Sequence, residues 1–392
     1  MKKNICIIVK SLNDGGAERA AANLSKDLYD TFNTYLIVYD GSDIAYPFKG
    51  TLLDLNTRIS TNKIKRMLSF IKRCYLIKGL KKQYNIDYSI SFMPGANLVN
   101  VLSRYKEKII TSQRNTMSIR SNSQIQNSIM RWVAKNSEVT VALSKGVKTD
   151  LIQNLNFPDD KVVTIYNSCE KNWLDIDDQS VNNIIQELDP DFKHVITTGR
   201  LTYQKGQWHL LKAFSEVAKQ NEKVKLIVLG TGEMRVELEE LAIQLGIENK
   251  VIFLGYVKNY HKLIEHCEIF VLSSLFEGLG NVLLEALAFE IPIIAADCNY
   301  GPKEILDPKN NNKTESIHFG EYGVLVPDFG LDRFNKNTIA NDKEKILAGA
   351  IINLLEDESK RMFYSNRSKE RFNDFNPNII KDEWINLIEK LM

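Results

Sequence analysis

The chain has 392 residues, of which 44% are hydrophobic and 26% charged, a composition typical of soluble globular proteins. This length exceeds what one hydrophobic core accommodates, so we expect two domains. Residues 1–180 carry 26 Lys and Arg against 17 Asp and Glu, whereas residues 181–392 carry 25 against 32. A basic half beside an acidic half predicts that one half faces an anionic partner.

The start of the chain and the cysteine pattern bear on localisation. No apolar run reaches the roughly 18 residues that a membrane span requires. The opening stretch MKKNICIIVK is interrupted at Lys10, too early for a signal peptide. Five cysteines without CxxC spacing, and a first histidine at His194, argue against a disulfide framework or a zinc site. We therefore expect a cytoplasmic protein with reduced thiols.

Strand-like apolar runs alternate with helical patterns along the chain. The first series of predicted strands covers residues 5–9, 34–40, 88–92, 108–111 and 139–143. The second series covers residues 194–199, 224–230, 250–255, 269–274 and 291–296. This alternation predicts the α/β class, with two Rossmann-like domains whose parallel sheets face each other across a cleft. Ligands of such sheets bind beyond the carboxyl ends of the strands.

A polar, acidic stretch over residues 168–192 separates the two series and is interpreted as a linker. The predicted domains are therefore 1–170 and 171–368. An amphipathic helix within 369–392 is expected to pack back on the first domain.

Gly15 and Gly16 follow the first predicted strand and lead into a helix. Backbone N–H groups at such a helix start favour an anion, although a simple tight turn also explains the two glycines. Asp40 ends the second strand and resembles a ribose-binding acid. The GxGxxG fingerprint that would accompany it in a dinucleotide oxidoreductase is missing, which argues against that class.

Arg200 and Lys205 flank a short loop after the first strand of the second series. Two cations beside a helix start suit a diphosphate, and a solvated surface pair is the alternative. The turn containing Gly232 and the strand end at Tyr256 lie at the same predicted edge, where their backbone could line a nucleotide pocket.

The stretch FEGLGNVLLEAL places Glu277 on a loop and Glu285 within a helix that Asn281 is expected to cap. Both carboxylates could point at one ligand above the loop. The alternatives are a surface acid at Glu277 and a helix-dipole acid at Glu285. The loop residues expected to line the same pocket are Gly278, Leu279, Gly280 and Asn281.

Taken together, these motifs resemble the retaining glycosyltransferases of family 4, which have the GT-B fold. The resemblance covers nearly the whole chain and includes SLNDGGAER, IYNSCE, GRLTYQKG, GTGEMRVELEELAIQLGIENKVIFLG and FEGLGNVLLEALA. It implies that Arg200 and Lys205 bind the donor diphosphate and stabilise the departing nucleotide. Glu277 would then contact the donor sugar and Glu285 the ribose hydroxyls.

The resemblance also implies that Gly16 lies against the donor and that Asn167, near the domain crossing, is a donor-binding residue. Many relatives have a histidine after a strand in the middle of the first domain, where this chain has TSQRNTMS. Gln113 and Arg114 are therefore candidates for the acceptor side of the site.

No cluster of metal ligands stands after a predicted strand. The pairs Asp175-x-Asp177 and Asp189-x-Asp191 mimic a metal-binding DxD motif, but both fall in the polar linker. We therefore expect metal-independent chemistry without a cofactor, in which fixed cations stabilise the leaving diphosphate. The resemblance implies retention of the anomeric configuration.

No acid occurs between Asp54 and Asp87, a stretch that holds nine Lys and Arg. These are Arg58, Lys63, Lys65, Arg66, Lys72, Arg73, Lys78, Lys81 and Lys82. Apolar residues interleave with them at helical spacing, which predicts a basic amphipathic helix on an anionic membrane or a lipid diphosphate. Packing of the apolar side on the first sheet is the alternative. The expected membrane contacts are Lys72, Arg73, Lys81 and Lys82, and no nucleic-acid module is present.

The leading hypothesis is a retaining transferase that moves a hexose or N-acetylhexosamine from a nucleotide sugar, with UDP as the expected nucleotide. The acceptor would be a lipid-diphosphate-linked saccharide in the synthesis of a surface polysaccharide such as a lipopolysaccharide O-antigen. The enzyme would be peripheral on the inner face of the cell membrane. A non-catalytic nucleotide-sugar-binding protein of the same fold is the alternative.

Overall fold

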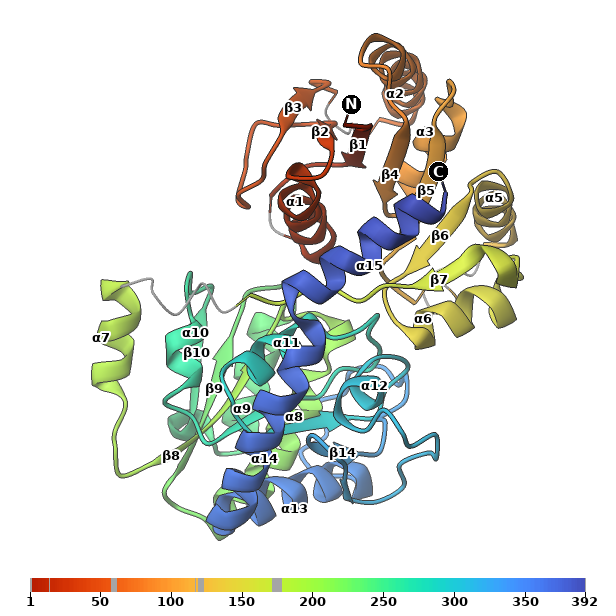
Figure 1. Cartoon of the computed structure of the whole chain (residues 1–392). Helices are drawn as coiled ribbons and strands as arrows, with labels where there is room; N and C mark the ends of the chain where they lie inside the picture. Colours follow the sequence, from red (N-terminus) through yellow and green to blue (C-terminus); the bar gives the residue numbers. More distant parts are fainter. Residues whose placement is uncertain are drawn as a thin grey trace. The chain divides into compact units, whose positions relative to one another are not determined.

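The computed structural model describes residues 2–13, 15–57, 62–116, 118, 123–170 and 178–391, and leaves the side chain of Lys63 undescribed. The chain divides into two compact units, residues 1–168 with 377–392 and residues 169–376 (Figure 1). Each unit is built around one sheet of parallel or mostly parallel strands, which confirms the predicted α/β class. Asp175 and Asp177 of the expected linker lie outside the described residues.

The N-terminal unit contains a seven-stranded parallel sheet in the order β3–β2–β1–β4–β5–β6–β7. The strands are β1 Asn4–Val9, β2 Asn33–Val38, β3 Thr51–Asp54, β4 Tyr88–Phe92, β5 Lys108–Gln113, β6 Val139–Ala142 and β7 Val162–Thr164. The apolar runs form the central strands because a strand covered on both faces has no side turned to water. The edge strand β3 is half exposed and lacks such a run, so the sequence did not predict it.

Helices cover both faces of this sheet. They are α1 Gly16–Tyr29, α2 Lys63–Gln83, α3 Pro94–Leu102, α5 Gln124–Lys135, α6 Lys145–Thr149 and α15 Pro377–Lys390. Ile5 and Ile7 pack in one core with residues of α1 and α15. Cys6 and Ile8, which point to the opposite face, pack with Ile77 of α2 and with residues of α3. Two helical layers therefore enclose the sheet.

The C-terminal unit contains a seven-stranded sheet in the order β10–β9–β8–β11–β12–β14–β13, in which only the β13–β14 pair is antiparallel. Its strands are β8 Lys193–Thr198, β9 Val224–Leu229, β10 Val251–Gly255, β11 Ile269–Leu272, β12 Ile293–Ala296, β13 His318–Phe319 and β14 Val324–Val326. Its helices are α7 Gln179–Glu187, α8 Gln207–Gln220, α9 Arg235–Gln244, α10 His261–Ile264, α11 Asn281–Ala288, α12 Pro302–Leu306, α13 Asp342–Glu356 and α14 Glu358–Phe372. Trp208 and Phe214 of α8 are fully buried in the core between this sheet, α8 and α13.

The last helix of the described chain belongs to the N-terminal unit. Ile380, Trp384 and Ile388 of α15 are buried in the core that holds Leu24 and Leu28 of α1. The dark blue α15 accordingly lies beside α1 in Figure 1. It begins at Pro377, later than the expected boundary at residue 369, because residues up to Phe372 still belong to α14.

The basic stretch forms α2, but two of the four expected membrane contacts were assigned to the wrong side of it. Lys81 has no exposed surface, and its ammonium donates to Asn100 O at 2.9 Å and Asn100 Oδ1 at 2.8 Å and lies 2.7 Å from Glu107 Oε1. Arg73 is also buried; it stacks 4.5 Å from the centroid of the Tyr39 ring, and Nε donates to Thr57 Oγ1. Neither side chain can reach a membrane, whereas Lys72 and Lys82 are exposed.

Within the described part of the chain, no helix has the length and apolar character needed to cross a bilayer.

Candidate active site

The loops after β8 and β9 pack directly against each other. Leu201 N donates to Thr231 O at 2.8 Å, and Met234 N donates to Leu201 O at 3.0 Å. A Cβ atom at Gly232 would lie 2.2 Å from Leu201 O, so only glycine permits this approach. Gly232, which was predicted to line the donor pocket, therefore has a packing role that holds the β8 loop in place.

Lys205 and Glu277 form the centre of the site, although they are far apart in the sequence. Lys205 Nζ lies 2.6 Å from Glu277 Oε1, and Ser274 Oγ donates to the same carboxylate oxygen at 2.7 Å. Both side chains are largely buried, with 14% of Lys205 and 8% of Glu277 exposed. Ion pairs are stronger in such surroundings than at a wet surface. The structure thus brings together the ammonium and the carboxylate that were predicted to share one ligand.

Backbone hydrogen bonds fix the position of Glu277. Its N–H donates to Asn299 O at 3.0 Å, and its carbonyl accepts from Tyr300 N at 3.1 Å. The neighbouring Cys298 is buried, which raises the pKa of its thiol well above the usual range, and the charge of Glu277 adds to this effect. Cys298 is therefore a neutral packing residue beside the site.

Arg200 lies on the same loop as Lys205 but takes no part in the ion pair with Glu277. Its side chain is exposed and has no hydrogen bond or ion pair with any described residue. Its carbonyl accepts from Gln207 Nε2 at 3.1 Å, which ties the loop to the first turn of α8. The structure thus places Arg200 near Lys205 in the chain without joining it to the Lys205–Glu277 pair.

Glu285 is buried in α11 and has a partner that sequence reasoning missed. The hydroxyl of Tyr260 donates to Glu285 Oε2. The Tyr260 ring stacks on His261 with centroids 4.4 Å apart, and His261 stacks on Phe289. Tyr260 therefore orients the carboxylate that is expected to bind ribose. The predicted residue Tyr256, by contrast, has 65% of its surface exposed.

The loop before α11 corrects one prediction. Gly280, with φ of 87°, occupies the N-cap position and makes no side-chain capping bond, whereas Asn281 is the first helical residue. Asn281 is therefore not the cap. Leu279 is buried, and a Cβ at Gly301 would lie 2.3 Å from its carbonyl oxygen. Gly278 is buried in the same loop.

In the N-terminal unit, Arg114 and Asn167 meet at the carboxyl edge of the sheet. Arg114 Nη1 donates to Asn167 Oδ1 at 2.9 Å, and its guanidinium stacks 4.7 Å from the centroid of the Phe92 ring. Burial lowers the pKa of Arg114 to about 9. Asn167 was expected to bind the donor, but its described contact is with the candidate acceptor residue Arg114.

Gln113 and Met93 lie at the same edge. Gln113 is buried, and its Oε1 accepts no hydrogen bond from the residues the structure describes. Met93, with φ of 78°, has a backbone conformation that non-glycine residues rarely adopt. Its sulfur accepts from Asn115 Nδ2 at 3.8 Å. Such strain is invisible to residue patterns, so sequence reasoning missed Met93.

Gly15 and the Asp189-x-Asp191 pair lie apart from the residues above in the sequence. Gly15 precedes α1, and its N–H donates to the Tyr46 hydroxyl at 3.3 Å, while Gly16 begins the helix. Asp189 and Asp191 form a local turn in which Asp191 N donates to Asp189 Oδ1 at 3.0 Å. Over the described ranges, no group of three or more His, Cys, Asp or Glu side chains is arranged to hold a metal ion.

Two family models match the chain. The model described as Glycosyltransferase Family 4 matches residues 14–171, and the model described as Glycosyl transferases group 1 matches residues 179–316. A glycosyltransferase of Methanocaldococcus jannaschii is 31% identical over 356 residues, covering 84% of this chain and 86% of the relative. The chain therefore belongs to glycosyltransferase family 4.

Two relatives from Campylobacter jejuni have more specific names. One is an N-acetylgalactosamine-N,N'-diacetylbacillosaminyl-diphospho-undecaprenol 4-alpha-N-acetylgalactosaminyltransferase, 26% identical over 383 residues and covering 94% of both chains. The other is a GalNAc-alpha-(1->4)-GalNAc-alpha-(1->3)-diNAcBac-PP-undecaprenol alpha-1,4-N-acetyl-D-galactosaminyltransferase, 27% identical over 393 residues. It covers 99% of this chain and 98% of the relative.

Solved structures share the fold. HepE of Anabaena in complex with UDP has a TM-score of 0.77 at 19% identity, covering 99% of this chain and 100% of that chain. WaaG, a glycosyltransferase involved in lipopolysaccharide biosynthesis, has a TM-score of 0.71 at 13% identity, covering 98% and 99%. These likenesses confirm the GT-B fold class that the sequence predicted.

Proposed function

We propose that this glycosyltransferase moves a hexose or N-acetylhexosamine from a UDP-sugar to a lipid-diphosphate-linked saccharide, with retention of anomeric configuration and without a metal. The two Campylobacter relatives support this acceptor class, since their names specify diphospho-undecaprenol saccharides. The UDP bound in HepE supports UDP as the nucleotide of the donor. The product would belong to a surface polysaccharide.

The observation that carries the proposal is the buried Lys205–Glu277 pair at the carboxyl edge of the second sheet. A fixed ammonium there can neutralise the charge that develops on a departing diphosphate, and the exposed Arg200 can add a guanidinium. Donor binding would draw Lys205 toward the phosphate and leave Glu277 to accept a sugar hydroxyl. Glu285, oriented by Tyr260, would hold the ribose.

The oxygen of the acceptor hydroxyl would form a new bond to the anomeric carbon as the bond between that carbon and the diphosphate oxygen breaks. The hydroxyl proton would pass to the departing diphosphate oxygen. The electron pair of the broken bond leaves with the nucleoside diphosphate, where Lys205 and Arg200 stabilise it. Gln113 and Arg114, at the carboxyl edge of the first sheet, are the proposed acceptor-side residues.

The protein would act as a peripheral enzyme on the inner face of the cell membrane, where lipid-linked saccharides are available. The exposed Lys72 and Lys82 of α2 support contact with an anionic surface. The buried Arg73 and Lys81 take no part in that contact.

The test is a donor screen in which the protein is incubated with UDP-sugars, a lipid-linked acceptor and EDTA. We expect nucleotide release that depends on the acceptor, and NMR of the product should show the anomeric configuration of the donor. Inversion would refute the proposed stereochemistry, and loss of turnover in EDTA that added metal restores would refute metal independence.

The variant Glu277→Gln separates an enzyme from a binding protein. We expect it to retain UDP binding and lose turnover, because it keeps the shape of the side chain but not its charge. Glu321→Gln is a matched control, since Glu321 is also a partly buried acid with a cationic partner, Arg367, at 2.9 Å. UDP-sugar binding without turnover in the native chain, unchanged by Glu277→Gln, would instead indicate a non-catalytic nucleotide-sugar-binding protein.

A further inference from the structure

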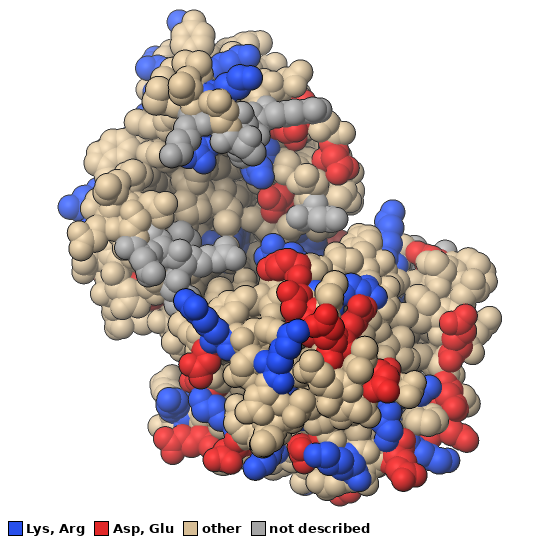
Figure 2. Space-filling model, turned by 180° about the vertical axis from the view of Figure 1, so that it is seen from behind, with Lys and Arg blue, Asp and Glu red and all other residues tan. Residues whose placement is uncertain are grey.

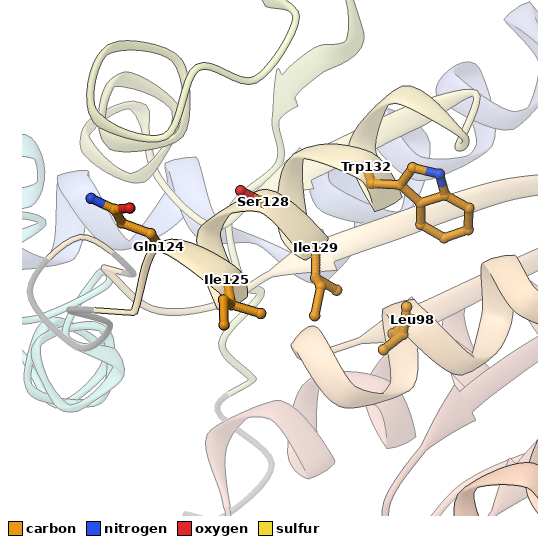
Figure 3. Close-up of a pocket in the computed structure, with 6 residues that line it drawn as sticks. All are labelled: Leu98, Gln124, Ile125, Ser128, Ile129 and Trp132. Atoms are coloured by element: carbon orange, nitrogen blue, oxygen red, sulfur yellow. The ribbon is translucent and has the colours of Figure 1, made fainter.

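An apolar groove lies between α3 and α5 of the N-terminal unit. It has a volume of about 540 Å³ and is lined by Leu98, Gln124, Ile125, Ser128, Ile129 and Trp132. Figure 3 shows that Ile129 and Trp132 project from α5 on the side where Leu98 of α3 lies. Ile125 and Trp132 have 73% and 44% of their surface exposed. The α5 side of the groove therefore adds little to the core of the unit, because Ile125 and Trp132 remain largely in contact with water.

A second apolar surface lies on α2, which packs against α3 as α3 packs against α5. Its exposed residues follow helical spacing along one side of the helix and are Ile64, Met67, Leu68, Ile71 and Tyr75. Each of them has between 57% and 79% of its surface exposed. We call these five exposed residues of α2 the stripe. The stripe and the groove thus belong to three neighbouring helices, α2, α3 and α5.

The opposite side of α2 explains why the stripe faces outward. Arg73 and Lys81 occupy that side, and their buried partners are Thr57, Asn100 and Glu107. Rotating the helix to bury the stripe would break these bonds and leave buried charges without partners, which is strongly unfavourable. The stripe is therefore held in an exposed position by the contacts on the other side of the helix.

The charged side chains that these three helices carry have one sign. No Asp or Glu occurs within α2, α3 or α5. The exposed cations on these helices are Lys65, Arg66, Lys72, Lys78, Lys82 and Lys135. Figure 2 shows Lys and Arg side chains gathered at the top of the N-terminal unit, where α2 lies, with few acids among them. Exposed apolar residues among cations match the interface of an anionic lipid bilayer.

We propose that α2, α3 and α5 form one docking surface for an anionic bilayer, in which the stripe of α2 and the α3–α5 groove both receive lipid hydrocarbon. Trp132 would lie at the level of the headgroups, where its ring has apolar and polar neighbours. This inference rests on the proposed function only in that a lipid-linked acceptor requires a membrane. It extends the contact from the basic residues of α2 to a second helix, α5.

Vesicle flotation of the full chain tests the proposal without any nucleotide sugar. Wild-type protein should float with phosphatidylglycerol-containing vesicles, and less with pure phosphatidylcholine or at high salt. We expect the groove variant Ile129→Ser/Trp132→Ser and the stripe variant Met67→Ser/Ile71→Ser each to reduce partitioning about tenfold or more. The matched control is Val236→Ser/Ile243→Ser on α9, where each residue has 62% of its surface exposed. It should float like the wild type.

Three outcomes would overturn the proposal. Unchanged flotation of the groove variant would remove α5 from the membrane contact. A wild-type dimer in sedimentation that the groove variant converts to monomers would show that a second copy covers the groove. Equal binding of wild type and variant to empty vesicles, with turnover lost only on a long-chain lipid acceptor, would assign the groove to the acceptor tail.

Failure of the proposed function would look different. A chain that floats on vesicles but binds no UDP-sugar would refute the glycosyltransferase proposal and leave the docking surface intact. A chain that turns over a soluble acceptor but does not float would refute the docking surface alone.

Discussion

Lys81 in the N-terminal unit and Lys205 in the C-terminal unit each pair with a glutamate, at 2.7 Å and 2.6 Å. Lys81 and Glu107 have no exposed side-chain surface, and Asn100 accepts two further hydrogen bonds from the ammonium. Lys205 retains 14% exposure in the loop after β8, where a ligand can compete for it. The partners of a cation, and the access of water to it, thus distinguish a structural ion pair from a reactive one.

The largest expected effect is a loss of protein stability when the Lys81–Glu107 pair is broken. Lys81→Ala should lower the free energy of unfolding by about 3–5 kcal/mol, because it leaves the Glu107 carboxylate buried without its cation. Denaturant unfolding measures this loss. Lys82→Ala is the control, since the neighbouring side chain is exposed and should matter little. Equal losses of unfolding free energy in Lys81→Ala and Lys82→Ala would show that the Lys81–Glu107 pair is not a structural ion pair.

The next effect is on catalysis by the C-terminal pair. Lys205→Ala should raise the barrier by ~3–4 kcal/mol, a loss of about 10²–10³-fold in kcat. Steady-state nucleotide release provides the measurement. Lys343→Ala removes another partly exposed lysine of this unit, which lies 3.4 Å from Asp328, and should leave kcat unchanged. Retention of full activity by Lys205→Ala would contradict its role at the diphosphate.

Asn167→Leu tests the buried cation Arg114, which donates a hydrogen bond to the amide oxygen of Asn167. Loss of the bond from Arg114 should cost about 1.5–3 kcal/mol of stability, because hydrogen bonds to charged groups are strong when buried. Thermal unfolding checks this value. The comparison variant is Asn154→Leu. It removes the hydrogen bond that Asn154 donates to Asp150 within the π-helical turn Asp150–Asn154, where Asn154 is the less buried of the two residues. A stable Asn167→Leu protein would show that Arg114 does not depend on this contact.

The smallest expected effect comes from Tyr260→Phe, which removes one hydroxyl. Glu285 should then be less well oriented, and UDP affinity should fall by about 1 kcal/mol, or roughly fivefold. Isothermal titration calorimetry with UDP gives the value. Tyr256→Phe alters an exposed tyrosine and should leave the affinity as it is. A larger loss with Tyr256→Phe than with Tyr260→Phe would reverse the assignment.

The central strands, and the convergence of Lys205 and Glu277 at one sheet edge, were predictable because the signals for strands and loops are local. Buried strands require unbroken apolar runs, and parallel sheets bring the residues after each strand to one edge. The loop motifs after β8 and β11 could therefore be expected to meet at that edge from the residue pattern alone. The short edge strand β3 lacks such a run and escaped prediction.

Local patterns of this kind could not predict which side of α2 is buried. They also could not predict that Tyr260 contacts Glu285. Arg73 and Lys81 look like their exposed neighbours in the sequence, and their burial depends on Thr57 and Glu107, which lie on other elements. Tyr260 lies in a loop and reaches Glu285 through a contact between distant parts of the chain. Long-range contacts of this kind leave no periodic signature in one sequence.

The return of α15 to the N-terminal unit has a consequence for synthesis. The core of that unit contains Trp384 and Ile388, which leave the ribosome only after all of residues 169–376 have been made. Domains usually fold as units while translation proceeds, with the N-terminal one first. Here the C-terminal unit can complete its core before the N-terminal unit does. Until then, the apolar residues of α1 and β1 that later contact α15 remain a target for chaperones.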